Sequence, residues 1–81
     1  MEAATMARTV SFFAAVKRLR RRYARQGLQL KRARSAYDRA YLGEWYVIDV
    51  RRNFIAQQYV DIHQAAADEG VLSPGERVGA E

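Results

Sequence analysis

Few side chains in this 81-residue chain are of the types that carry out catalysis, and their spacing does not assemble a site. The chain has no cysteine, which excludes disulfides, thiolate metal sites and cysteine nucleophiles. The one histidine, His63, has only Asp61 and Asp68 nearby in the sequence, which is too few ligands for a metal ion. It also lacks a nucleophile at a spacing suited to general-base catalysis. We therefore expect no catalytic residue, no metal site and no cofactor, and a protein that is not an enzyme.

A different chemistry, the binding of phosphate groups, is well represented. Residues 1–42 contain eleven Lys and Arg against two acids, whereas residues 43–81 contain three against seven. The segment KRLRRRYARQ at 17–26 concentrates the positive charge. Arginine presents a planar fork of donors that matches phosphate oxygens. This asymmetry predicts a polyanionic partner for the first half, or ion pairs between the two halves within one chain or between subunits.

We interpret the basic side chains as contacts with nucleic-acid phosphates, made with little discrimination between sequences. The same charge also fits a solvated face that only keeps the protein soluble, or an acidic protein surface as partner. An anionic membrane surface is a less favoured fourth interpretation, based on Phe12, Phe13 and Val16 beside the arginines. No known nucleic-acid-binding motif accompanies the basic segment, so DNA and RNA are not distinguished. The candidate nucleic-acid-binding residues are Lys17, Arg18, Arg21, Arg22, Arg25, Lys31, Arg32, Arg51 and Arg52.

The first element that must position these side chains is a helix. Ser11 is a suitable N-cap, and apolar or aromatic residues recur at alternating spacings of three and four from Phe12 to Ala40. Gly27 costs about 1 kcal/mol relative to Ala inside a helix, yet the periodicity continues across it. The spacing predicts one long basic amphipathic helix over residues 12–42, bent at Gly27. Two helices with a break near Gln26–Gly27 are the alternative.

Residues 44–60 have the aromatic and β-branched composition of strands and predict a two-stranded antiparallel hairpin. The loop is expected at 51–53, with Asn53 in the left-handed conformation. Val50 then lies opposite Phe54, and Ile48 lies opposite Ala56. Arg51 and Arg52 at the tip are either phosphate contacts or ordinary exposed turn residues. The face expected to pack on the helix carries Tyr46, Ile48, Val50, Phe54 and Ala56.

The second face of this hairpin predicts a protein interface, because one helix can cover only one face and a hairpin with two apolar faces is not stable alone in water. We expect a homodimer, or a subunit of a larger complex. In the alternative, the C-terminal segment folds back over this face through Ile62, Val71 and Leu72, and the protein is a monomer. The predicted partner-interface residues are Trp45, Val47, Ile55 and Tyr59.

The remaining residues predict one short helix and no second domain. Asp61 and Gln64 approximate a capping box that begins a helix over residues 62–69, and Gly70 can end it. The chain is thus predicted to be a single α+β domain over 1–81, with flexible ends at 1–10 and 76–81. No apolar segment approaches the roughly 18 residues of a membrane span, and the expected compartment is the cytoplasm. Import into an organelle through the Arg-rich N-terminal segment is the alternative.

Together these features predict a small basic binding protein, regulatory or otherwise, whose arginine-rich helix contacts nucleic-acid phosphates. The alternative is a small accessory subunit or inhibitor that docks on a larger protein through the aromatic hairpin. Salt distinguishes the two. Phosphate binding falls steeply with salt, whereas docking through Trp45 and Tyr59 depends on the burial of apolar surface.

Overall fold

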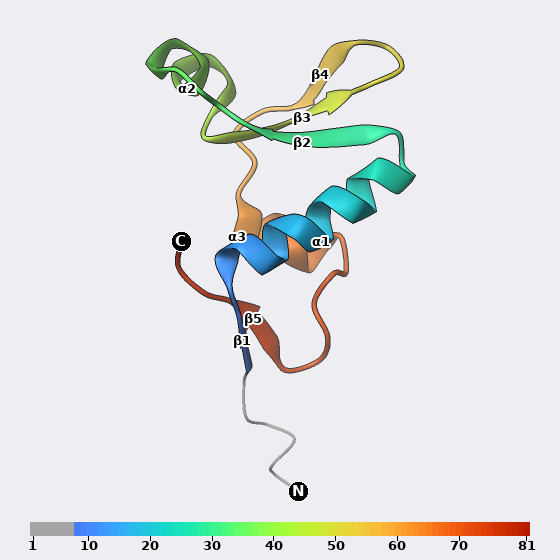
Figure 1. The fold of residues 1–81 in the computed structure, drawn as a ribbon, viewed down its shortest axis with the longest axis vertical. Coiled ribbons are helices and arrows are strands. Elements are labelled where there is room, and N and C mark those ends of the chain that lie inside the picture. Colours follow the sequence, from blue (N-terminus) through green and yellow to red (C-terminus); the bar gives the residue numbers. More distant parts are fainter. Residues whose placement is uncertain (1–7) are drawn as a thin grey trace, which may run out of the picture.

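The structure is a computed structural model that describes residues 8–81, and it confirms a mixed α+β fold (Figure 1). Within these residues, β2, β3 and β4 form an antiparallel sheet in that order, and β1 pairs with β5 in parallel. The elements are β1 Arg8–Val10, α1 Phe12–Arg25, β2 Leu28–Arg32, α2 Ala36–Leu42, β3 Trp45–Asp49, β4 Phe54–Gln57, α3 Ile62–Asp68 and β5 Glu76–Val78.

The predicted single helix over residues 12–42 is wrong, because the chain reverses at Gly27. Ser11 caps α1 as expected, through a hydrogen bond from the Ala14 amide. After Arg25 the helix ends, and Gly27 takes a φ of +77°, the left-handed conformation that closes many helices. Residues 28–32 then form β2, which pairs with β3. The alternative break near Gln26–Gly27 is therefore present, but a strand follows it. Tyr37, one of the aromatic residues in the spacing that predicted the long helix, is 70% exposed.

The hairpin predicted at 44–60 is present as β3 and β4, in a different register. Asn53 has a φ of +57°, as expected for the end of the loop, and its amide donates to Asp49 O at 2.8 Å. Phe54 lies opposite Asp49 instead of Val50, so the loop is one residue longer than predicted. Ile48 consequently pairs with Ile55, and the register shifts again at a bulge between Val47 and Ile48.

The core lies between α1, α3 and one face of the three-stranded sheet (Figure 1). Leu19 and Tyr23 of α1 are fully buried in the cluster that also contains Val47. Trp45 is 4% exposed, and its ring centre lies 6.0 Å from that of Phe12. The prediction that Trp45 and Val47 are exposed at a partner interface is therefore wrong, because α1 covers the face that was expected to be free.

The opposite face of the sheet is the one that lacks a helix along its length. Ile48 and Tyr46 are only half-buried there, and Ile55 is 42% exposed. Phe54 was also predicted to be covered by the helix, yet it is 49% exposed. Ile55 and Tyr59 are accessible, and their contact with a partner stays a prediction.

The C-terminal segment packs back onto the core beside α1. Asp61 caps α3 as predicted, accepting hydrogen bonds from the amides of His63 and Gln64. Val71 and Leu72, which follow α3, pack against the core cluster. Residues 76–78 then pair with residues 8–10, where the sequence analysis expected flexible ends. The rest of the first expected flexible segment, residues 1–7, lies outside the described part of the chain.

Gly43 ends α2 at a close approach between two segments, and this makes a testable prediction. Its φ is +83°, and a Cβ at this position would lie 2.7 Å from Tyr59 Cα. Gly70 has a φ of +69° but nothing within 4 Å, so it is a matched control. We expect Gly70→Ala to cost about 1–2 kcal/mol of unfolding free energy from backbone strain alone, and Gly43→Ala to cost clearly more. Urea unfolding measures both, and equal losses would show that the approach of Tyr59 imposes no constraint.

Candidate functional site

The basic side chains of α1 are divided between two flanks of the helix. Its buried face consists of Phe12, Ala15, Val16, Leu19 and Tyr23. At 100° per residue, Arg18, Arg22 and Arg25 lie to one side of this face, and Arg20 lies to the other side. Lys17 and Arg21 point outward between the flanks and are exposed.

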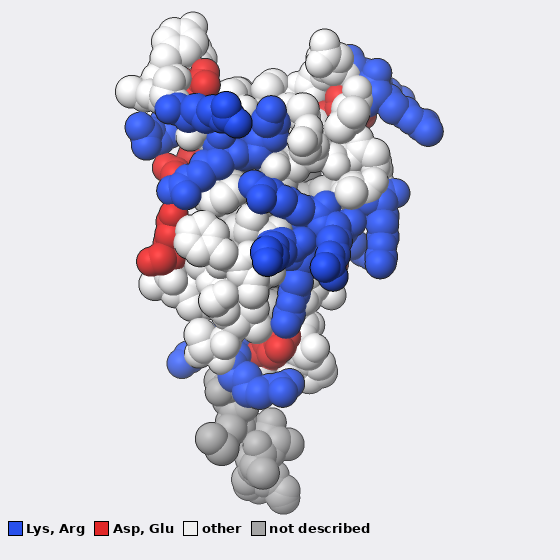
Figure 2. All heavy atoms as spheres, viewed as in Figure 1, with Lys and Arg blue, Asp and Glu red and all other residues white. Residues whose placement is uncertain are grey.

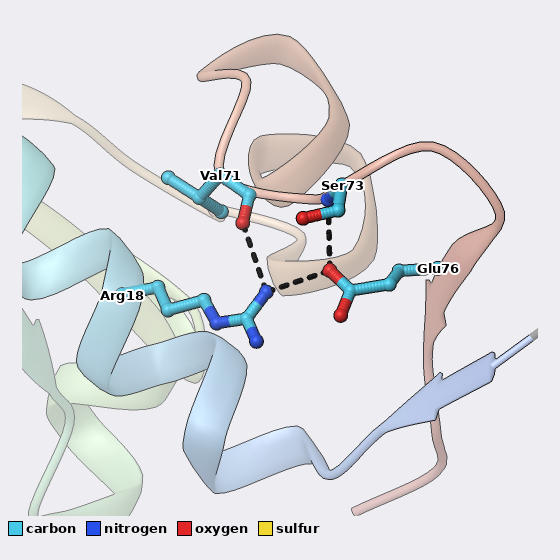
Figure 3. A network of polar contacts seen from close by, with 4 residues as sticks. All are labelled: Arg18, Val71, Ser73 and Glu76. Atoms are coloured by element: carbon cyan, nitrogen blue, oxygen red, sulfur yellow. Dashed lines mark hydrogen bonds and ion pairs between the residues drawn. The ribbon is translucent and has the colours of Figure 1, made fainter.

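The flank that carries Arg18 and Arg22 is paired with acids of the C-terminal segment. Arg18 Nη1 donates to Glu76 Oε1 at 2.8 Å and to Val71 O at 3.1 Å (Figure 3). Arg22 Nε lies 3.5 Å from Glu69 Oε1. These contacts confirm ion pairs between the basic and acidic halves of the chain. Both arginines were predicted as phosphate contacts, and in this structure they are held by carboxylates instead.

Arg32 is also held within the protein. Its Nε donates to Glu44 Oε2 at 2.7 Å and its Nη2 donates to Glu81 Oε2 at 2.7 Å. The guanidinium carbon lies 5.3 Å from the centre of the Trp45 ring, a cation–π geometry. The hydrogen bond to Glu44 raises the pKa of Arg32 above its ordinary value. Two carboxylates thus neutralise a side chain that was predicted to bind phosphate.

The opposite flank of α1 borders a groove of about 710 Å³ along β2. We call this hollow the basic groove: Arg20 and Ala24 line it from the helix, and residues 28–34 line it from β2 and the chain that follows. Its basic side chains are Arg20, Lys31, Arg32 and Arg34, and no acid lines it. Between residues 8 and 81, Arg20, Lys31 and Arg34 take part in no ion pair. The groove therefore holds three positive charges that no described carboxylate offsets.

The open edge of the sheet adds backbone donors beside these charges. β2 is an edge strand, since it pairs only with β3 in the described sheet. The bonds Ala33 N to Glu44 O and Val50 N to Gly27 O show that odd-numbered residues of this segment bond to β3. In an antiparallel pair the intervening residues turn their N–H and C=O groups the other way. Leu28 and Leu30 consequently present backbone amides at the edge that borders the groove.

Positive charge continues from the groove towards the hairpin loop. A second hollow of about 570 Å³ shares Ala24 with the basic groove and is lined by Arg25, Arg51 and Arg52. Asp49 is the acid in its lining, and its Oδ1 accepts a hydrogen bond from the Arg52 amide at 3.0 Å. Figure 2 shows Lys and Arg gathered over α1 and towards both ends of the sheet.

The structure thus regroups the predicted phosphate contacts. Lys31 lies beside Arg20 and Arg34, which were not among the predicted nucleic-acid-binding residues. The signal that could have found them was Gly27, since a reversal there returns the chain along the flank of α1 that carries Arg20.

The described residues give no support for a metal site or for a membrane-spanning helix. Between residues 8 and 81, no three His, Asp or Glu side chains gather to hold a metal ion. His63 is exposed, with its Nδ1 3.7 Å from Asp61 Oδ1. No helix in this part of the chain is both long enough and apolar enough to cross a membrane.

Comparison with known proteins found no matching family model, no matching curated protein and no matching solved structure. The functional argument therefore depends on the geometry and charge of the described residues.

The contacts of Glu76 predict a pH dependence of stability. The Arg18 guanidinium and the Ser73 amide, which donates to Glu76 Oε1 at 2.7 Å, lower the pKa of this carboxyl from 4.5 to about 2 (Figure 3). A lowered folded-state pKa stabilises the fold above the unfolded pKa, and this stabilisation disappears as the pH falls through the folded value. We expect Glu76→Gln to reduce the urea midpoint at pH 7 and the difference from the wild type to shrink between about pH 4.5 and pH 2.

A double-mutant cycle with Arg18→Gln checks that the effect comes from this contact. Because the two side chains share one ion pair, the double variant should lose less stability than the two single losses combined. Additive losses, or a difference from the wild type that does not change with pH, would contradict the role given to Glu76.

Proposed function

We propose that this protein binds nucleic-acid phosphates through the basic groove and acts as a binding protein, not as an enzyme. The observation that carries the proposal is the groove itself, which Arg20, Lys31 and Arg34 line without any acid. A hollow lined by one sign of charge concentrates the field and raises the local concentration of a polyanion.

The groove also has the donors that a phosphate backbone requires. The Arg20 and Arg34 guanidiniums can each offer paired N–H groups to phosphate oxygens. The edge amides of β2 are a second set of donors, and backbone N–H groups commonly position nucleic acids in this way. α1 is fixed by its buried face and β2 by its pairing with β3, so both walls are firmly placed.

The distribution of acids favours this proposal over a merely solvated basic face. On the far flank of α1, Glu76 pairs with Arg18 and Glu69 pairs with Arg22, while Glu44 and Glu81 pair with Arg32. A charge that served solubility alone would not need to gather in a hollow, whereas Arg20, Lys31 and Arg34 line one groove and pair with no carboxylate between residues 8 and 81. The membrane interpretation is weakened, since Phe12 and Val16 are buried and only Phe13 of that apolar set is exposed.

The alternative function, docking on a larger protein through the hairpin, loses part of its basis. Trp45 and Val47 are enclosed in the protein's own core, so two of its four predicted contact residues are unavailable. The homodimer expected from the same face loses the same two residues. Ile55 and Tyr59 are left to support either assembly.

The groove is tested by removing two of its charges. We expect Arg20→Gln/Arg34→Gln to weaken binding to labelled 15-nucleotide single strands and duplexes by roughly tenfold or more at 0.1 M salt, for all sequences alike. The slope of log K against log salt should fall by about 0.7 per lost contact on single strands and about 0.9 on duplexes. Fluorescence anisotropy over a salt series measures both quantities.

The matched control is Arg8→Gln/Arg77→Gln, which removes the same charge from exposed positions on β1 and β5, at the end of the molecule away from the three-stranded sheet (Figure 1). This variant should bind nearly as the wild type does. Equal losses in both double variants would mean that net charge alone attracts the nucleic acid, and wild-type affinity in the groove variant would refute the proposal.

A further inference from the structure

The helix α2 is held in place by its backbone while its side chains face solvent. None of its residues is buried, in contrast to α1 and α3. Its first turn is capped by Ser35 Oγ, which accepts a hydrogen bond from the Asp38 amide at 3.0 Å. At its other end the Tyr59 hydroxyl donates to Ala40 O, and Gln58 Nε2 donates to Tyr41 O at 3.1 Å. The core therefore does not explain the side chains of this helix.

Two of these side chains form an aromatic surface, which we call the tyrosine pair. Tyr37 and Tyr41 are 70% and 59% exposed, and they lie one helical turn apart. Their ring centres are 4.7 Å apart with an angle of 39° between the planes. Exposed aromatic rings held on a fixed backbone can stack against a flat ligand at a small cost in conformational entropy.

The helix that carries the tyrosine pair follows the basic groove directly along the chain. Arg34 lines the groove, Ser35 caps α2, and Tyr37 follows in the first turn. Figure 1 shows α2 at one end of the sheet and the β3–β4 loop at the other, with β2 running between them. A nucleic-acid strand that follows the groove from the loop would therefore reach α2. Arg39 adds a positive charge to α2, against one acid, Asp38.

We propose that the ligand is a single-stranded nucleic acid whose unpaired bases stack on Tyr37 and Tyr41 while its phosphates lie along the basic groove. This inference rests on the proposed function. Proteins that bind single strands combine a positive groove with aromatic side chains, because every unpaired base offers a face for stacking. In a duplex each base is already stacked between its neighbours, so a duplex could use the groove but not the tyrosine pair.

The experiment compares single strands and a duplex on variants of the tyrosine pair. Labelled 15-nucleotide oligo(dT), oligo(rU) and a mixed-sequence duplex are titrated with the full chain. We expect Tyr37→Ala/Tyr41→Ala to weaken single-strand binding at least about 5-fold. For this variant, the slope of log K against log salt and the affinity for the duplex should stay unchanged, because the phosphate contacts remain.

Two controls separate stacking from other effects. Tyr37→Phe/Tyr41→Phe keeps the rings and should restore single-strand affinity. Phe54→Ala removes an exposed aromatic ring from β4 and should have little effect. Circular dichroism should show all of these variants folded, since the side chains that they change are exposed.

The outcomes distinguish this inference from the proposed function. If Arg20→Gln/Arg34→Gln weakens binding but Tyr37→Ala/Tyr41→Ala does not, the proposed function of the groove is supported and the stacking role of the tyrosine pair is overturned. Equal or tighter binding of the duplex by the wild type also overturns it. If the tyrosine variant instead changes only the sedimentation coefficient, the pair is a contact between copies of the chain or with another protein. If no nucleic acid binds at all, the proposed function and this inference fail together.

Discussion

The reversal of the chain at Gly27 is the constraint on which the rest of the structure depends. The left-handed backbone there ends α1, and the Gly27 carbonyl accepts a hydrogen bond from Val50 N at 3.2 Å. β2 is thereby set beside α1 and against β3 at once. That placement lets Leu30 and Val47 meet Leu19 in the core. It also creates the basic groove, whose two walls are the segments on either side of this turn.

The acidic half of the chain determines where positive charge stays unpaired on the basic half. Because Glu69 and Glu76 approach α1 from one flank only, they pair with Arg18 and Arg22 there, whereas Arg20 on the other flank borders the basic groove beside Lys31 and Arg34. The strand pair of β1 and β5 keeps the C-terminal segment close to that flank. A net charge of +5 is thus spread unevenly over the surface, and the proposed binding of a polyanion at one side rests on this unevenness.

Local features were predictable from the sequence, whereas the placement of the elements relative to one another was not. The Ser11 and Asp61 caps, the left-handed backbone at Asn53 and the two strands around it depend on the chemistry of a few neighbouring residues. All are present, although the loop is one residue longer than predicted. The prediction of one long helix was wrong because apolar residues can fall at spacings of three and four by chance where a strand and a short exposed helix follow each other. β2 helps to decide which face of the hairpin packs against α1. The prediction of a single helix over residues 12–42 assigned the residues of β2 to that helix, so the covered face was predicted wrongly. For the same reason the candidate site included Lys31 but missed its neighbours Arg20 and Arg34.

The division between paired and unpaired cations separates what holds the protein together from what is available for binding. Arg18 fixes the turn at Val71 and the strand that contains Glu76, and Arg32 lies against Trp45, so these side chains support the fold. Arg20 and Arg34 make no such contact with the described residues. A domain of this size has a small margin of stability, because it buries only about 60–65% of its unfolded surface. Because the fold does not depend on the groove cations, the proposed binding of a ligand there would not draw on that margin.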